Sequence, residues 1–413
     1  MSSENPRQGM GTLVNHVAEG NNPLHAHVIP IYQTSTFSFP DVANGAAIFN
    51  GKEDGYVYTR WNNPNLDQIA RKYAVLEGLD LLRAQPGVDP DKLVAGMVFA
   101  SGMAAISSAV LARVKSGDTV IAQKAVYSAT YNLLNDLAPQ YQIRVIWLED
   151  PSVEQWEEAF QAHPEARLAY AETPANPTMT VVDLKAVAEI AHRYNAWVIV
   201  DNTFATPYCQ RPLTLGVDIV VHSTTKYLSG HGQIIGGAVV SSHVDFIHKE
   251  VYAMLKILGG SASPFDAWLA NTGLKTFELR MQRHCENSLA VAKFLEAHPK
   301  VDRVYYPGLE SHPDYAIACK QMSSFGGMIS FELKGGVEAG ASMMNHVALA
   351  TLAVSLGNVD TLIQHPASMT HHSVPRQVRL SAGITDGLVR LSVGIENVED
   401  IIADLDQAMS FYG

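Results

Sequence analysis

Cysteine is scarce in this sequence, and long apolar runs are missing. Of its 413 residues only three are cysteine, and they form neither a CxxC pair nor a zinc-binding spacing. We therefore expect no disulfide framework and no metal site, and we expect Cys209, Cys285 and Cys319 each to be a buried, reduced thiol. No apolar run approaches the roughly 18 residues that a membrane-spanning helix needs, so we expect no membrane anchor.

Positive charge is also limited. The chain has 29 Lys and Arg against 41 Asp and Glu, which gives a net charge of −12. An acidic protein without a basic cluster is repelled by phosphate backbones and anionic bilayers, so nucleic acid and membrane surfaces are disfavoured as partners. The stretch from Met1 to Arg7 lacks the apolar core of a secretory signal, and we expect a cytoplasmic protein.

A dinucleotide-binding fingerprint is missing as well. A G-x-G-x-x-G turn would have to follow the first strand, but the segment Phe99–Ala105 carries a single glycine, Gly102. This disfavours a nicotinamide-dependent oxidoreductase. The same segment still leads from a strand into a small-residue helix, and the free N–H groups at a helix start suit a phosphate.

The most informative stretch that is present runs from His222 to Gly232 and contains Lys226. Two apolar runs that predict buried strands flank this lysine, 218–221 and 236–240. A lysine at the end of a buried strand is costly unless its charge is lost, paired, or removed by a covalent bond to an aldehyde cofactor. Ser223 and Thr225 add hydroxyls of the kind that bind phosphate. An ordinary strand-end lysine is the alternative.

A second stretch favours the cofactor. Residues 196–203 form an apolar strand that ends in Asp201. A buried carboxylate with no cationic neighbour in the sequence needs a partner, and the protonated ring nitrogen of pyridoxal phosphate is such a partner. A lysine on the aldehyde together with an aspartate on the ring nitrogen is the signature pair for this cofactor. The two stretches together predict a pyridoxal-phosphate site.

The order of the predicted elements indicates an α/β fold. Strand segments alternate with helical ones, which predicts a doubly wound, mostly parallel sheet covered by helices on both faces. The expected strands are 97–99, 118–122, 144–148, 168–171, 197–200, 218–221 and 236–240. Ligands of such sheets lie beyond the carboxyl ends of the strands, where the sequence places Ser101, Tyr127, Glu172, Asp201 and Ser223. Tyr127 could stack on a planar cofactor ring there, or only pack in the core.

Three parts are expected along the chain. Residues 1–63 show little helical periodicity and predict an arm that packs on another unit, including a second subunit. Arg60 in this arm could bind an anion bidentately or simply lie on the surface. Residues 64–262 form the large cofactor-binding domain. Residues 263–413 begin with helices and continue with short strands, so they predict a smaller C-terminal α/β domain.

Five motifs together resemble one enzyme family: Tyr58–Arg60, Ser101–Met103, Val200–Thr203, Ser223–Tyr227 and Leu388–Gly394. From about Val28 to Met409 the chain resembles the Cys/Met-metabolism family of pyridoxal-phosphate enzymes. Its members include methionine γ-lyase, the cystathionine enzymes and the O-acylhomoserine sulfhydrylases. The resemblance implies pyridoxal 5'-phosphate as cofactor, the aspartate aminotransferase-like fold of type I, and a homotetramer, a dimer of dimers with active sites shared across subunits.

The resemblance also implies roles for individual residues. Lys226 would hold the cofactor and shuttle protons, Asp201 would pair with its ring nitrogen, and Tyr127 would stack on the ring and act as acid or base at the leaving group. The remaining cofactor contacts would come from Gly102, Met103, Thr203, Ser223 and Thr225, with Tyr58 and Arg60 from a neighbouring subunit. The substrate carboxylate would be bound by Arg390, helped by Asn176 and Ser355.

Two variable positions bear on the substrate. Family members that act on cystathionine usually carry a glutamate before the serine of a Ser-Leu-Gly segment and an arginine shortly after the stacking tyrosine. Here these places hold Val354 and Asn132, so a charged distal end would find no partner. This favours a small apolar thioether or a simple acylated homoserine.

The segments 226–232, 283–285 and 326–336 most resemble methionine γ-lyase, which converts methionine into 2-oxobutanoate, methanethiol and ammonia. Methionine γ-lyase has a cysteine two residues after the stacking tyrosine, whereas this sequence has Ala129. It also has a lysine-aspartate pair where this sequence has Lys256 and Ile257. We therefore expect γ-elimination on a sulfur amino acid. The alternatives are γ-replacement, as in an O-acetylhomoserine or O-succinylhomoserine sulfhydrylase, or a cystathionine γ-synthase or lyase. A non-catalytic pyridoxal-phosphate-binding protein would be expected to have lost Lys226 or Asp201.

Overall fold

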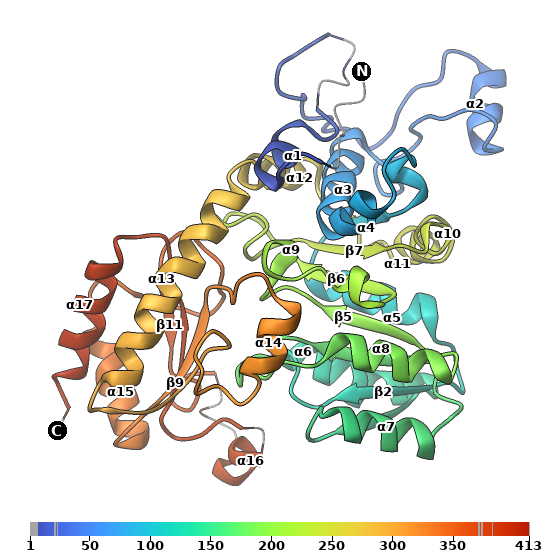
Figure 1. The fold of residues 1–413 in the computed structure, drawn as a ribbon. Coiled ribbons are helices and arrows are strands. Elements are labelled where there is room, and N and C mark those ends of the chain that lie inside the picture. Colours follow the sequence, from blue (N-terminus) through green and yellow to red (C-terminus); the bar gives the residue numbers. More distant parts are fainter. Residues whose placement is uncertain are drawn as a thin grey trace.

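Two β-sheets organise the chain (Figure 1). The computed structural model describes residues 7–19, 22, 24–370, 372, 375–381 and 383–412. Residues 1–6 of the predicted arm and Gly413 of the predicted C-terminal domain lie outside this description. Within the described ranges, no helix combines the length and the apolar character that crossing a membrane requires.

The larger sheet has seven strands in the order β1-β7-β6-β5-β4-β2-β3. Strands β2 to β6 pair in parallel, whereas β7 runs antiparallel to both of its neighbours. The strands are β1 (Ala95–Phe99), β2 (Thr119–Gln123), β3 (Arg144–Leu148), β4 (Leu168–Glu172), β5 (Trp197–Asp201), β6 (Ile219–Ser223) and β7 (Gly237–Ser241). Each lies within two residues of an expected strand, which confirms the mostly parallel sheet.

Helices cover both faces of this sheet because its strands are apolar on both sides. In β5, Val198 and Val200 belong to one apolar cluster, whereas Ile199 between them belongs to another. The first cluster includes residues of α3 (Pro64–Glu77), α7 (Val153–Ala162), α8 (Leu184–Arg193) and α9 (Thr206–Cys209). The second includes residues of α5 (Gly102–Arg113) and α11 (Tyr252–Leu258). Each such aliphatic side chain contributes about 2 kcal/mol by its burial.

Short helices connect these elements: α4 (Leu79–Ala84), α6 (Ser128–Asn132) and α10 (Val244–Phe246).

The smaller sheet has five strands in the order β10-β11-β12-β9-β8. These are β8 (Val301–Tyr305), β9 (Met328–Leu333), β10 (Thr351–Leu352), β11 (Leu362–Gln364) and β12 (Leu388–Ser392). The long helix α13 (Phe277–Ala297) crosses it in Figure 1, and α15 (Gly336–His346) and α17 (Val398–Met409) share its apolar cluster. The other helices of this half are α12 (Pro264–Leu274), α14 (Tyr315–Gln321) and α16 (Arg376–Ser381).

The N-terminal arm contains two helices, α1 (Met10–His16) and α2 (Val42–Phe49), where the sequence predicted little helical structure. Helix α1 forms because Met10, Leu13 and Val14 lie on one face and are buried in the same cluster as α3. Helix α2 stands away from the body of the molecule (Figure 1). Its Val42 and Phe49 side chains are 90% and 61% exposed.

The three cysteines differ in exposure. Cys209 is buried, as expected, whereas Cys285 is only partly buried and Cys319 is exposed. The expectation of three buried thiols is therefore wrong for Cys319 and met only in part by Cys285. Cys319 lies on α14, a short helix that turns one side to solvent. The Sγ atoms of Cys209 and Cys285 lie 3.7 Å apart, and all three thiols are free.

Candidate active site

Lys226 lies just beyond the carboxyl end of β6, at the edge of the larger sheet where the sequence predicted a ligand site. Its Nζ donates a hydrogen bond to Ser355 Oγ over 2.7 Å. Burial, together with the positive charge of Arg390, lowers the pKa of this amine to about 8. Ser355 has a φ of +85°, which costs a non-glycine residue about 1 to 3 kcal/mol and is typical of functional sites.

The turn that carries Lys226 is fixed by Arg280, which sequence reasoning missed. This buried guanidinium donates to the carbonyls of Tyr227 at 2.7 Å and Gly273 at 3.0 Å. Gly230 follows with φ +73°, and a Cβ there would lie 2.0 Å from Arg280 Nη1. The Arg280 hydrogen bonds and the close approach at Gly230 together constrain the backbone that follows Lys226.

Asp201 ends β5 and is 6% exposed. Its Oδ1 accepts a hydrogen bond from the backbone N–H of Thr203 at 3.0 Å, and Thr203 Oγ1 accepts one from Ser223 N at 2.9 Å. Burial raises the pKa of this carboxyl. In the described part of the chain no Lys or Arg forms an ion pair with Asp201, so a cation supplied by a ligand would stabilise its charged form.

Gly102 and Ser223 meet where α5 begins beside the end of β6. A Cβ on Gly102 would lie 2.8 Å from the Cβ of Ser223, so only glycine lets the start of the helix come this close. Ser101 caps the helix by accepting from Ala104 N at 3.0 Å, which leaves the N–H groups of Gly102 and Met103 free of helical partners. The hydroxyl of Thr225, in contrast, is engaged with the backbone N–H and C=O of Gly236.

Arg390 approaches from β12 of the smaller sheet and is 8% exposed. Its guanidinium donates to Asn176 Oδ1 at 3.1 Å and to the Ser355 carbonyl at 2.8 Å. Burial lowers its pKa to about 10, so it is charged at neutral pH. No carboxylate within the described ranges forms an ion pair with it. A buried guanidinium without an anion is suited to bind a substrate carboxylate.

Tyr127 precedes α6, and its side chain is 45% exposed. Its backbone N–H donates to Glu172 Oε2 at 2.7 Å. Hydrogen bonds thus join one group of residues: Lys226, Ser355, Arg390, Asn176, Glu172 and Tyr127. A second group meets at the ends of β5 and β6: Asp201, Thr203, Ser223 and Gly102.

Tyr58 and Arg60 lie elsewhere. The Arg60 guanidinium stacks over the Tyr58 ring, 5.5 Å from its centroid, and donates to the carbonyl of Lys256. Both residues line a pocket of about 400 Å³ together with residues 33–35, Thr59, Gly259, Ser261 and Pro264. None of their described contacts within this chain reaches Lys226 or Asp201.

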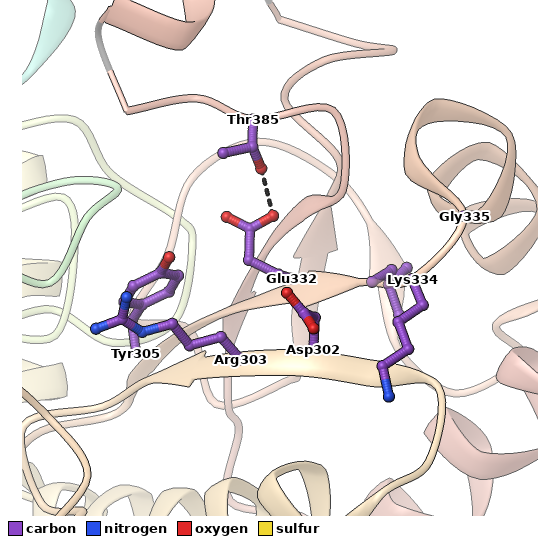
Figure 2. A pocket seen from close by; sticks show the side chains of 8 residues that line it. Asp302, Arg303, Tyr305, Glu332, Lys334, Gly335 and Thr385 are labelled. Carbon is purple, nitrogen blue, oxygen red and sulfur yellow. Dashed lines mark hydrogen bonds between the residues drawn. The ribbon is translucent and has the colours of Figure 1, made fainter.

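A separate pocket of about 580 Å³ lies on the smaller sheet (Figure 2). Its walls carry charges of both signs, including Glu332 and Arg303. Thr385 donates a hydrogen bond to Glu332, and the Arg303 guanidinium lies over the Tyr305 ring, 4.9 Å from its centroid. Burial raises the pKa of Glu332. This pocket contains no predicted site residue. Among the described residues, no group of three or more His, Cys, Asp or Glu side chains is arranged to hold a metal.

The residues present fit pyridoxal phosphate. The amine of Lys226 has a depressed pKa and points to a hydroxyl rather than an acid. Asp201 is a buried carboxyl that pairs with no Lys or Arg among the described residues, and the protonated ring nitrogen would supply a cation. The close approach at Gly102 leaves free N–H groups for the phosphate.

The pKa of Lys226 predicts how the cofactor-free protein captures pyridoxal phosphate. Only the neutral amine attacks an aldehyde, and it predominates above its pKa. Capture is therefore expected to accelerate about tenfold per pH unit between pH 6 and 7 and to level off near pH 8 rather than above pH 10. Stopped-flow absorbance of the apoprotein mixed with cofactor measures this rate. A profile that still rises tenfold between pH 9 and 10 would contradict the expectation.

Comparison with known proteins identifies the family. The model of the Cys/Met metabolism PLP-dependent enzymes matches residues 11–410. The chain is 48% identical to an L-methionine γ-lyase of Fusobacterium nucleatum subsp. nucleatum over 98% of this chain and 99% of that protein. The chain is also 40% identical to a cystathionine β-lyase of Coxiella burnetii, over 99% of this chain and 100% of that protein.

Solved structures agree with the fold. The crystal structure of metB from Corynebacterium glutamicum superposes with a TM-score of 0.88 at 37% identity and covers 98% of this chain and 99% of that chain. The architecture is therefore that of the pyridoxal-phosphate enzymes of fold type I, as expected. The chain belongs to the Cys/Met-metabolism family of pyridoxal-phosphate-dependent enzymes.

Proposed function

We propose that this enzyme catalyses γ-elimination from L-methionine and yields 2-oxobutanoate, methanethiol and ammonia. The observation that carries the proposal is the placement of Lys226, Asp201 and Arg390, which provides an amine, a ring partner and a carboxylate site in one cluster. The uncharged Val354 and Asn132 leave no partner for a charged distal end, which supports methionine. The 48% identity to a methionine γ-lyase supports the same choice.

The chain's own residues divide the work. Pyridoxal phosphate, when bound, supplies an electron sink for negative charge at Cα and Cβ of an amino acid. Arg390 and Asn176 hold the substrate carboxylate and so fix which Cα–H faces Lys226. The Lys226 amine takes the Cα proton, and the phenol of Tyr127 donates a proton to the departing sulfur. Asp201 keeps the ring nitrogen protonated.

A substrate panel tests the reaction. The purified, pyridoxal-phosphate-loaded enzyme is incubated with methionine, cystathionine, O-acetylhomoserine or O-succinylhomoserine, each with and without sulfide. We expect 2-oxobutanoate and methanethiol from methionine alone. Homocysteine formed only from an acylated homoserine plus sulfide would instead establish a sulfhydrylase, the second candidate. Ala129 and the surrounding segment 127–134 favour that alternative.

We further propose the three-part organisation 1–63, 64–262 and 263–413, with the first part reaching a neighbouring subunit in a homotetramer. Tyr58 and Arg60 then bind the cofactor phosphate of the neighbour, and this is supported by their described contacts, which join them to each other and to Lys256 rather than to Lys226. The exposed Val42 and Phe49 of α2 support burial of the arm against another subunit. The free thiols support a reducing compartment, the cytoplasm.

Subunit mixing tests the shared site. Lys226→Ala and Arg60→Ala are each expected to be nearly inactive alone. When the two variants are mixed and reassembled, each hybrid dimer regains one site with both residues intact, so activity returns to about a quarter of wild type. Arg83→Ala in place of Arg60→Ala is the control for a remote arginine. Activity no greater than the sum of the separate variants would contradict sharing between subunits.

A further inference from the structure

Glu172, which the sequence places only at the edge of the sheet, binds two site residues at once. It ends β4 and is 4% exposed. Its Oε2 accepts from Tyr127 N at 2.7 Å, and its Oε1 accepts from Asn176 N at 3.0 Å. Each carboxyl oxygen therefore holds the backbone of a residue that the proposed function uses, one at the ring and one at the substrate carboxylate.

Glu172 is itself fixed to the sheet. The fully buried amide of Gln123, at the end of β2, donates to the Glu172 carbonyl at 2.9 Å and accepts from the Glu172 N–H at 3.1 Å. This pairing joins two strands at their carboxyl ends. The Glu172 backbone is therefore fixed to the sheet by two hydrogen bonds. The position of its carboxyl group in turn sets the positions of the two N–H groups that it binds.

The hydrogen bonds continue from Glu172 to the lysine. Asn176 accepts from Arg390, which also donates to the carbonyl of Ser355, and the hydroxyl of Ser355 accepts from Lys226. A continuous series of bonds thus connects Tyr127 to Lys226 through Glu172. A shift of Glu172 would move the stacking residue and the carboxylate-binding residue together.

The surroundings of Glu172 act on its charged form in opposite directions. Burial and the neighbouring Asp201 raise its pKa to about 8, whereas the N–H groups of Tyr127 and Asn176 favour the carboxylate, which accepts through both of its oxygens. A glutamine has nearly the same shape but carries hydrogens on one side of its amide. It could therefore accept only one of the two bonds.

We propose that Glu172 is a positioning residue that sets Tyr127 and Asn176 at one fixed spacing across the bound cofactor and substrate. The proposal rests on the proposed function, because that function gives Tyr127 and Asn176 their roles. Glu172 acts through the backbone N–H groups of these two residues.

The test is Glu172→Gln in the full-length, cofactor-loaded enzyme, with L-norleucine as the probe. Norleucine has no leaving group at Cγ, so its binding can be followed by the visible absorbance of the cofactor whether or not the enzyme cleaves methionine. We expect cofactor stoichiometry to persist, norleucine affinity to fall about tenfold or more, and the visible circular dichroism of the cofactor to fall below about half of wild type. Unchanged affinity and dichroism would overturn the proposal.

Asp404 offers a matched control. This buried carboxylate of α17 also accepts from two backbone N–H groups, those of Ala348 at 2.7 Å and Ala350 at 2.8 Å. Asp404→Asn makes the same chemical change away from the site. It should lower the melting temperature but leave norleucine affinity and cofactor dichroism at wild-type values. Equal losses of norleucine affinity and cofactor dichroism in both variants would mean that Glu172 only stabilises the fold, and would overturn the proposal.

A second measurement needs no variant. Tyr127 precedes α6, so its N–H has no helical partner and is held by Glu172 alone among the described contacts. If Glu172→Gln fails to fold, residue-resolved hydrogen exchange of the wild-type holoenzyme tests whether Glu172 holds these two amides. Slow exchange at the amides of Tyr127 and Asn176 is expected. Exchange at the rate of an open loop would overturn the proposal.

Discussion

Replacing Lys226 with alanine is expected to lower kcat about 10,000-fold or more, whereas pyridoxal phosphate should still bind without a covalent bond. The variant loses the amine that bonds to the cofactor and takes the substrate proton. It keeps Asp201 and the start of α5 at Gly102, so the ring nitrogen and phosphate retain their partners.

Two measurements check this expectation. Borohydride reduction followed by mass spectrometry should show a cofactor adduct on the wild type and none on the variant, and steady-state kinetics should give the lost rate. Lys249→Ala is the control, because Lys249 is an exposed lysine that pairs only with Asp245 in the described structure. A Lys226→Ala variant that retains the wild-type rate would refute the assignment.

Arg390→Lys is expected to raise KM for methionine about 30-fold or more and to change kcat less. Lysine keeps the positive charge but loses the planar pair of donors that grips a carboxylate bidentately. The carboxylate is held equally in the ground state and the transition state, so the loss falls mainly on KM. Steady-state kinetics over a wide range of methionine concentrations separates the two constants.

Arg379→Lys is the matched control for Arg390→Lys. Arg379 is a buried arginine as well, but it already has a carboxylate partner, Asp386, at 2.9 Å. Its replacement should lower the melting temperature and leave KM unchanged. If Arg379→Lys raised KM as much as Arg390→Lys, the effect would come from general loosening rather than from carboxylate binding.

The sequence was most informative about the cofactor end of the site. Asp201 ends β5 and Lys226 follows β6, and neighbouring parallel strands bring their carboxyl ends to one edge, so periodicity alone could predict that both residues lie at this edge. Arg390 and Asn176 are 214 residues apart and lie beside different sheets. Periodicity does not reveal such a contact, and the expectation for them rested on the family resemblance.

Other features could not be predicted because they depend on backbone groups or on packing against distant parts of the chain. Arg280 binds the carbonyl of Tyr227, a group that every residue has, across 53 residues of sequence. Glu172 likewise acts on two backbone N–H groups, so its residue type alone gives no signal. The short helix α1 is visible only in a few apolar residues, whose burial depends on α3.

Lys226 and Asp201 belong to the larger sheet, whereas Arg390 and Ser355 belong to the smaller sheet and its connections. The two ends of the site are therefore carried by different layers of the molecule. A small hinge rotation of one sheet against the other would separate Arg390 from Asn176 while leaving the partners of the cofactor ring in place. Substitutions at the contact between the sheets can thus weaken the grip on the amino acid without releasing the cofactor, so the two affinities can be tuned separately.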